Sequence, residues 1–190
     1  MNLSNQLTLS RLFLTLLFVI IISSSLPYSA SIALVIFAIA SFTDWLDGYV
    51  ARRYHLYTNF GRLMDPLVDK ILVAAAFICL IPLQAFPAWV VILIIARDFL
   101  ITGLRLLAGE QGILLSAERL GKHKTAWQLI TILFYLSLLS AREFSGNKIG
   151  NESIWITFSW EKIGPILVGI TLLLTVYSGV AYLWKNRGLL

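Results

Sequence analysis

The sequence has few charged residues and few of the side chains that bind soft metals. Only 13% of its 190 residues are charged, and it contains one cysteine and two histidines, whereas 58% of the residues are hydrophobic. The single cysteine, Cys79, excludes an intramolecular disulfide and a cysteine-based metal site. The scarcity of charge excludes a soluble domain, because a chain this short cannot bury so many apolar side chains in its own core. The sequence therefore belongs in a lipid bilayer.

Long apolar stretches recur along the whole chain. A helix needs about 20 mainly apolar residues to cross the hydrocarbon core of a membrane. We predict an all-α, polytopic membrane protein with six transmembrane helices and a single domain over residues 1–190. The predicted helices are residues 12–26, 31–50, 66–83, 88–107, 125–140 and 163–184.

Two stretches carry further predictions. Residues 12–26 have an alternative interpretation as a cleavable signal peptide, because Arg11 precedes them and small residues follow. Residues 142–162, which contain several glycines and asparagines, are predicted to form a loop on the outer side.

The basic residues fall mainly on one side of the predicted membrane protein. The formal net charge is +5, and most of the lysines and arginines lie in short gaps between apolar stretches that open to the side of both termini. Because cytoplasmic loops carry an excess of lysine and arginine, both termini are predicted to be cytoplasmic. This distribution favours membrane lipids with anionic headgroups as partners and argues against nucleic acid.

Four aspartates are predicted to meet near the cytoplasmic ends of two neighbouring helices. Asp44 and Asp47 lie near the end of the second predicted helix, and Asp65 and Asp69 lie near the start of the third. Helical spacing places each pair on one face of its helix. Four converging carboxylates repel one another unless a cation lies between them. A set of oxygen ligands without cysteine or histidine suits Mg²⁺, Mn²⁺ or Ca²⁺, and four acids can hold two such ions.

The alternative is that these acids are surface residues at helix ends. It fits Asp65 and Asp69, because a helix start favours negative charge. It does not fit Asp44 and Asp47, which lie inside an apolar stretch towards the end of a helix.

Small and basic residues accompany the aspartates. Gly48, Ala51 and Gly61 leave room for a bulky group to approach the backbone, and Arg52 can contact a phosphate. Together the residues form the pattern D-x2-D-G-x2-A-R-x8-G-x3-D-x3-D. This pattern resembles the signature of the CDP-alcohol phosphotransferase family.

The resemblance implies roles for the motif residues. The four aspartates are expected to hold two divalent metals, Mg²⁺ or Mn²⁺, with Asp69 also acting as the base on the acceptor hydroxyl. Gly48, Ala51, Arg52 and Gly61 are expected to contact the CDP group. A homodimer is expected from the resemblance alone.

Further segments resemble the bacterial phosphatidylglycerophosphate synthase subfamily. They are residues 2–11, 65–70, 97–105 and 121–125. The resemblance implies transfer of the phosphatidyl group of CDP-diacylglycerol to glycerol 3-phosphate, with release of CMP, in a bacterial inner membrane and at a site facing the cytoplasm. Two positions depart from the subfamily pattern: Ser4 stands where proline is usual, and Asp98 where glutamate is usual.

A basic group is predicted to bind the phosphate of the acceptor. The members of this basic group are Arg97, Arg105, Arg119 and Lys122, and Lys124 lies nearby in the sequence. These residues could instead follow the cytoplasmic charge bias or bind anionic lipid headgroups. Inositol phosphate and phosphatidylglycerol stay open as alternative acceptors. A metal or ion transporter is a further alternative, although its site should lie nearer the middle of the membrane.

Overall fold

The fold is helical throughout the part of the chain that the structure describes. The computed structural model describes residues 3–54, 59–110, 119–145 and 154–187, with side chains for residues 9–43, 67–68, 70–109, 121, 123–144 and 155–187. These ranges contain no strand. The helices are α1 Leu3–Ile22, α2 Ser29–Tyr54, α3 Asn59–Leu80, α4 Ala88–Glu110, α5 Arg119–Ser145, α6 Ile154–Phe158, the short π-helix η1 Ser159–Ile163 and α7 Gly164–Lys185.

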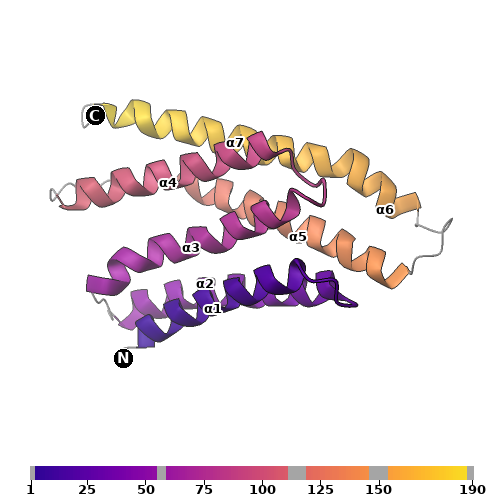
Figure 1. Cartoon of the computed structure of the whole chain (residues 1–190). Coiled ribbons are helices and arrows are strands. Elements are labelled where there is room, and N and C mark those ends of the chain that lie inside the picture. The colour runs from indigo at the N-terminus through magenta and orange to yellow at the C-terminus, as the bar shows by residue number, and fades with distance from the viewer. Residues whose placement is uncertain (1–2, 55–58, 111–118, 146–153, 188–190) are drawn as a thin grey trace.

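The six long helices form a closed ring with their axes roughly side by side (Figure 1). Around the ring, α1 contacts α2, α2 contacts α5, α5 contacts α7, α7 contacts α4, α4 contacts α3, and α3 returns to α1. Apolar side chains from several helices meet in the middle, and Phe18, Phe37, Phe77 and Ile132 are 0% exposed. Helices that are distant in sequence, such as α2 and α5, therefore surround a common interior.

The six predicted apolar stretches each coincide with one long helix, so their helical character is confirmed. Two of these helices end earlier than predicted, at Ile22 and Leu80. The predicted outer loop at residues 142–162 is wrong for the described residues of this stretch, 142–145 and 154–162, which are all helical. There α5 continues to Ser145, and residues 154–163 are helical and run directly into α7. The residues of α6 are apolar or aromatic apart from Thr157, and Ile156 is 8% exposed, whereas the glycines and asparagines behind the loop prediction lie at 146–151, outside the described residues.

The described helices have the surface of a membrane protein. Two stretches among them are long and apolar enough to cross a membrane, His123–Phe144 and Trp155–Lys185. Shorter apolar stretches are Leu9–Ile22, Ser29–Thr43 and Lys70–Leu80. Large apolar side chains also point out of the ring: Phe13 is 66% exposed, Ile92 64% and Leu173 71%. Exposed apolar surface of this extent is typical of a lipid-facing helix bundle.

One carboxylate joins α5 to the start of α2. Glu143 accepts hydrogen bonds from the backbone N–H groups of Ala30, at 2.7 Å, and Ser31, at 2.9 Å. The Ser31 hydroxyl donates to the same carboxylate at 2.7 Å. The first N–H groups of a helix have no partner within the helix and carry partial positive charge, so the carboxylate satisfies them. This contact lies at the end of α2 that is distant from Asp44 and Asp47.

Candidate functional site

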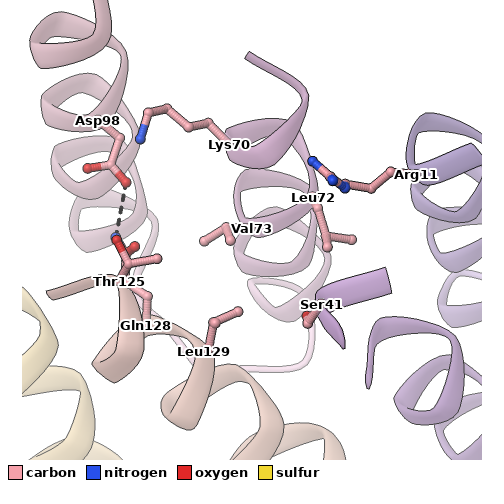
Figure 2. A pocket seen from close by; sticks show the side chains of 9 residues that line it. All are labelled: Arg11, Ser41, Lys70, Leu72, Val73, Asp98, Thr125, Gln128 and Leu129. Atoms are coloured by element: carbon pink, nitrogen blue, oxygen red, sulfur yellow. Dashed lines mark hydrogen bonds between the residues drawn. The ribbon is translucent and has the colours of Figure 1, made fainter. Parts of the chain in front are cut away.

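A cavity of about 190 Å³ lies inside the ring of helices (Figure 2). Its polar lining comes from five helices: Arg11 of α1, Ser41 of α2, Lys70 of α3, Asp98 of α4, and Thr125 and Gln128 of α5. Leu72, Val73 and Leu129 complete the wall. Ser41 is three residues before Asp44, and Lys70 directly follows Asp69. The cavity therefore adjoins the parts of α2 and α3 that carry the predicted metal ligands.

The residues of the predicted motif lie on two helices that contact each other. Asp44, Asp47, Gly48, Ala51 and Arg52 belong to α2, and Gly61, Asp65 and Asp69 belong to α3. Their side chains lie outside the described residues, so their roles stay predictions. Among the side chains that are described, no three His, Cys, Asp or Glu residues form a metal-binding group. The donor set of the motif, which is entirely carboxylate, fits a hard divalent cation.

Asp98 forms the centre of a buried polar cluster between α4 and α5. The residue is 7% exposed and accepts a hydrogen bond and ion pair from the Lys124 ammonium on Oδ1. The Gln128 amide donates to Oδ2 at 3.1 Å, and the Arg97 guanidinium lies 3.4 Å from Oδ1. Lys124 and Gln128 are each 1% exposed. A buried carboxylate is stable only when such donors satisfy it, so the cluster fixes α4 against α5.

The sequence did not predict this buried polar cluster around Asp98. In the sequence, Asp98 stood out only as a departure from the subfamily pattern. The signal that could have found it is the position of Asp98 in the middle of an apolar helix, where an acid needs a partner. Its partners, Lys124 and Gln128, lie 26 and 30 residues further along the chain. At this separation, helical periodicity does not predict which residues are in contact.

Two of the predicted acceptor-binding arginines turn towards α7. Arg97 donates from Nη2 to the Ser178 hydroxyl at 3.0 Å, and its aliphatic stem packs over Gly179. A Cβ on Gly179 would lie only 2.9 Å from Arg97 Cγ. Arg105 donates from Nε to the Tyr182 hydroxyl at 3.3 Å, and its guanidinium lies 5.1 Å from the centre of that ring. Neither arginine lines the cavity.

Of the four predicted acceptor-binding residues, the structure describes the side chains of Arg97 and Arg105. Arg119 and Lys122 belong to the first turn of α5, and their side chains lie outside the described residues. Arg97 contacts Asp98, which lines the cavity, but does not line the cavity itself. Binding of the acceptor by these four residues stays a prediction.

The described lining of the cavity contains two cations, Arg11 and Lys70, and one carboxylate, Asp98. Arg11 is 3% exposed, and Lys70 extends from α3 towards Asp98 (Figure 2). Within the described part of the chain, no carboxylate lies within ion-pair distance of Lys70. The Ser41 hydroxyl is buried and has no hydrogen-bond partner among the described residues. Buried polar groups are normally satisfied, so the cavity has room for a ligand or water at the Ser41 hydroxyl.

Comparison with known proteins relates the whole chain to one group of transferases. A sequence model of the CDP-alcohol phosphatidyltransferase family matches residues 1–178. A protein of Bacillus subtilis (strain 168) is 37% identical over 97% of this chain and 95% of its own length. A protein of Rickettsia bellii is 33% identical over 95% of this chain and 93% of its own, and one of Salmonella typhimurium is 31% identical over 98% and 96%. All three relatives are named CDP-diacylglycerol–glycerol-3-phosphate 3-phosphatidyltransferase.

Proposed function

Because the chain belongs to the CDP-alcohol phosphatidyltransferase family, we propose that it transfers the phosphatidyl group of CDP-diacylglycerol to glycerol 3-phosphate. The products are phosphatidylglycerophosphate and CMP, and the reaction serves phospholipid biosynthesis. The observation that carries this proposal is the similarity, over nearly the full length, to relatives from distant bacteria that are all named for this reaction. Arg11 and Lys70, in the described lining of the cavity beside the motif, support an anionic acceptor.

The proposed enzyme is a single domain in the bacterial inner membrane. All six long helices cross the membrane, both termini are cytoplasmic, and the site faces the cytoplasm. Support comes from the coincidence of each predicted apolar stretch with a long helix and from the distribution of basic residues. The proposal also includes a homodimer, which rests on family resemblance alone.

The chemistry is assigned to the motif on α2 and α3. Asp44, Asp47, Asp65 and Asp69 hold two divalent cations, Mg²⁺ or Mn²⁺, which when bound neutralise the pyrophosphate and stabilise the departing CMP. Asp69 accepts the proton of the glycerol 3-phosphate hydroxyl as that oxygen forms its bond to phosphorus and the bond to CMP breaks. The support is the carboxylate donor set and its place on α2 and α3, close in sequence to the cavity-lining residues Ser41 and Lys70.

The remaining motif residues and the basic residues position the substrates. Gly48, Ala51, Arg52 and Gly61 accommodate the CDP group. The basic residues of α4 and α5 attract glycerol 3-phosphate to the bundle, and they are Arg97, Arg105, Arg119 and Lys122. The support is that α4 and α5 both contribute residues to the cavity lining, Asp98 from α4 and Thr125, Gln128 and Leu129 from α5.

The proposal is tested by supplying purified protein with CDP-diacylglycerol, Mg²⁺ and one acceptor at a time, and measuring CMP release. We expect release with glycerol 3-phosphate and none with inositol phosphate or phosphatidylglycerol. Asp69→Asn should abolish release, and the matched change Asp98→Asn should leave measurable activity in protein that stays folded. Release with a different acceptor alone would keep the family chemistry and overturn the acceptor. No release with any acceptor would overturn the reaction and favour a transporter.

A further inference from the structure

A second pocket lies between α4, α5 and α7, at the end of the bundle opposite to the aspartate motif (Figure 1). We call it the α7 pocket. Its volume is about 420 Å³, which is within the usual range for small-molecule sites. The wall is mainly apolar and includes Val90 of α4 and Val168, Gly169 and Leu172 of α7. None of its described lining residues belongs to the cavity beside the motif, so the two pockets are separate.

The helices around the α7 pocket have a lipid-facing surface. α5 and α7 contain the two described stretches that are long and apolar enough to cross a membrane. Next to the lining residues, the side chains of Ile92, Ile166 and Leu173 are exposed. A molecule that enters the pocket across this surface comes from the bilayer. Lipid tails are as apolar as leucine, so polar groups of the site must supply any preference for a particular lipid.

One such polar group is the hydroxyl of Tyr135. Tyr135 is 2% exposed and lines the pocket, and its ring meets the Trp160 ring edge-on with the ring centres 4.9 Å apart. The hydroxyl lies against Gly164, at the start of α7, where an added Cβ would overlap it. It forms no hydrogen bond within the described part of the chain. A buried hydroxyl normally has a partner, so a ligand in the pocket needs a hydrogen-bond acceptor at this level.

The second polar group is the guanidinium of Arg142. It lies 4.3 Å from the centre of the Trp160 ring, and its Nε is buried without a hydrogen-bond partner. Among the described side chains, no carboxylate lies within ion-pair distance of Arg142. The neighbouring Glu143 is engaged with the start of α2, and Glu161, which lines the pocket, is exposed. A half-buried guanidinium with this geometry suits a phosphate oxygen.

These groups follow one another along the membrane normal in the order of the parts of a phospholipid. Arg142 lies seven residues beyond Tyr135 on α5, which is about 10 Å nearer to the end of the bundle. Thr131 and Thr171 are joined by a hydrogen bond of 2.8 Å, so the adjacent Leu172 lies about one turn deeper than Tyr135. A phospholipid in this leaflet has its phosphate outermost, its ester carbonyls next and its acyl chains deepest.

We propose that the α7 pocket binds an acyl chain of a membrane phospholipid from the leaflet opposite to the aspartate motif. The phosphate of this lipid contacts Arg142, and an ester carbonyl accepts a hydrogen bond from Tyr135. An apolar helix of a second copy could cover the wall, but it would supply neither an anion for Arg142 nor an acceptor for Tyr135. The inference goes beyond the proposed function, because it requires α5 and α7 to cross the membrane but does not require the transfer reaction.

The test places the purified full-length protein in nanodiscs with phosphatidylglycerol that carries a photoactivatable group on an acyl chain, and maps the labelled peptides by mass spectrometry. We expect labelling to concentrate on residues 85–90 and 165–172. Unlabelled phosphatidylglycerol should compete with the probe. Diacylglycerol with the same chains lacks the phosphate and should compete about tenfold less well, as for the loss of one charged hydrogen bond.

A variant that fills the pocket provides the sharpest comparison. A Cβ on Gly169 would meet nothing within 4 Å, so the side chain of Gly169→Leu can enter the pocket without a clash. This variant should lower labelling of the pocket about tenfold or more. Val176→Phe adds bulk at an exposed position of the same helix outside the lining and should leave the labelling as it is.

Two further variants test the polar contacts. Tyr135→Phe should raise the amount of phosphatidylglycerol needed for half-maximal labelling about threefold, and Arg142→Gln about tenfold. The matched controls Tyr177→Phe and Arg187→Gln change exposed residues outside the lining and should have no effect. In detergent micelles, added phosphatidylglycerol should raise the Tm of the wild-type protein more than that of Gly169→Leu, because a ligand stabilises the folded state that binds it.

Several outcomes would overturn the inference. Labelling spread evenly over exposed positions such as Phe13 and Ile20 of α1 would mean that only bulk lipid surrounds the protein. Equal competition by diacylglycerol would contradict the phosphate contact. Loss of the labelling in Asp44→Asn would assign the lipid to the substrate site, and a change of oligomeric state in Gly169→Leu would assign the pocket to a second copy. Protein that is labelled in the pocket but releases no CMP would keep this inference and overturn the proposed function.

Discussion

Removing the Asp98 carboxylate should destabilise the protein more than removing the Lys124 ammonium. In Asp98→Asn, Lys124 stays at a position that is 1% exposed without its carboxylate partner. Breaking a buried pair in this way costs about 3–5 kcal/mol. In Lys124→Met, Asp98 keeps the Gln128 hydrogen bond and the nearby Arg97, so the loss is about 1.5–3 kcal/mol, as for one charged hydrogen bond.

The two changes should also be strongly non-additive. With Lys124 already replaced by methionine, Asp98→Asn no longer strands a buried charge on α5 and removes mainly the contact with Arg97. Its cost in that background should fall to about 1–2 kcal/mol, as for a partly exposed charged contact. The double-mutant cycle should therefore give a coupling free energy of at least about 1 kcal/mol.

The assay is reversible unfolding of the purified protein in detergent micelles, with the free energy of unfolding measured for the four members of the cycle. Gln128→Leu in each background would show how much of the Asp98 cost belongs to the amide contact. Equal costs for Asp98→Asn in the presence and absence of Lys124 would refute the proposed coupling. If Asp98→Asn lowered the free energy of unfolding less than Lys124→Met, the buried Lys124 ammonium would not depend on the Asp98 carboxylate as its partner.

Three further predictions concern packing, a helix start and metal dependence. Gly179→Ala should lower the free energy of unfolding by about 1–3 kcal/mol, because its Cβ meets Arg97 Cγ at 2.9 Å, whereas Gly169→Ala, with nothing within 4 Å, should be neutral or stabilising in thermal unfolding. Glu143→Gln should cost about 1–3 kcal/mol because it turns an amide NH₂ against the donors at the start of α2, and the exposed Glu161→Gln should change stability by less than about 0.5 kcal/mol in the same measurement. EDTA should abolish CMP release, excess Mg²⁺ or Mn²⁺ should restore it, and activity that survives EDTA would contradict the two-metal site.

The helices were predictable because their signal is local. Apolar stretches interrupted by polar gaps define all six long helices, and the aspartate motif identifies the ends of α2 and α3. The segment 154–163 was not predictable as helix from its neighbours, since the glycine-rich and asparagine-rich residues before it dominated the interpretation. Its helical state follows from apolar side chains that continue into α7.

The cavity was much less predictable, because it depends on the order of helices around the ring. Sequence gives no reason why α4 should lie between α3 and α7, yet that order turns Arg97 and Arg105 towards Ser178 and Tyr182. It also brings Arg11, from the first helix, to a cavity wall shared with α5. Residue types therefore indicated an anionic acceptor, and packing determined which cations face the interior.

The most direct test follows radiolabelled glycerol 3-phosphate into lipid. Wild-type protein in vesicles containing CDP-diacylglycerol and Mg²⁺ should convert the label into an organic-soluble product that carries two phosphates per two acyl chains, with one CMP released for each molecule formed. Asp44→Asn and Asp69→Asn should each leave the label in water. Label that stays in water with the wild-type protein, while CMP is released with another alcohol, would contradict glycerol 3-phosphate as the acceptor.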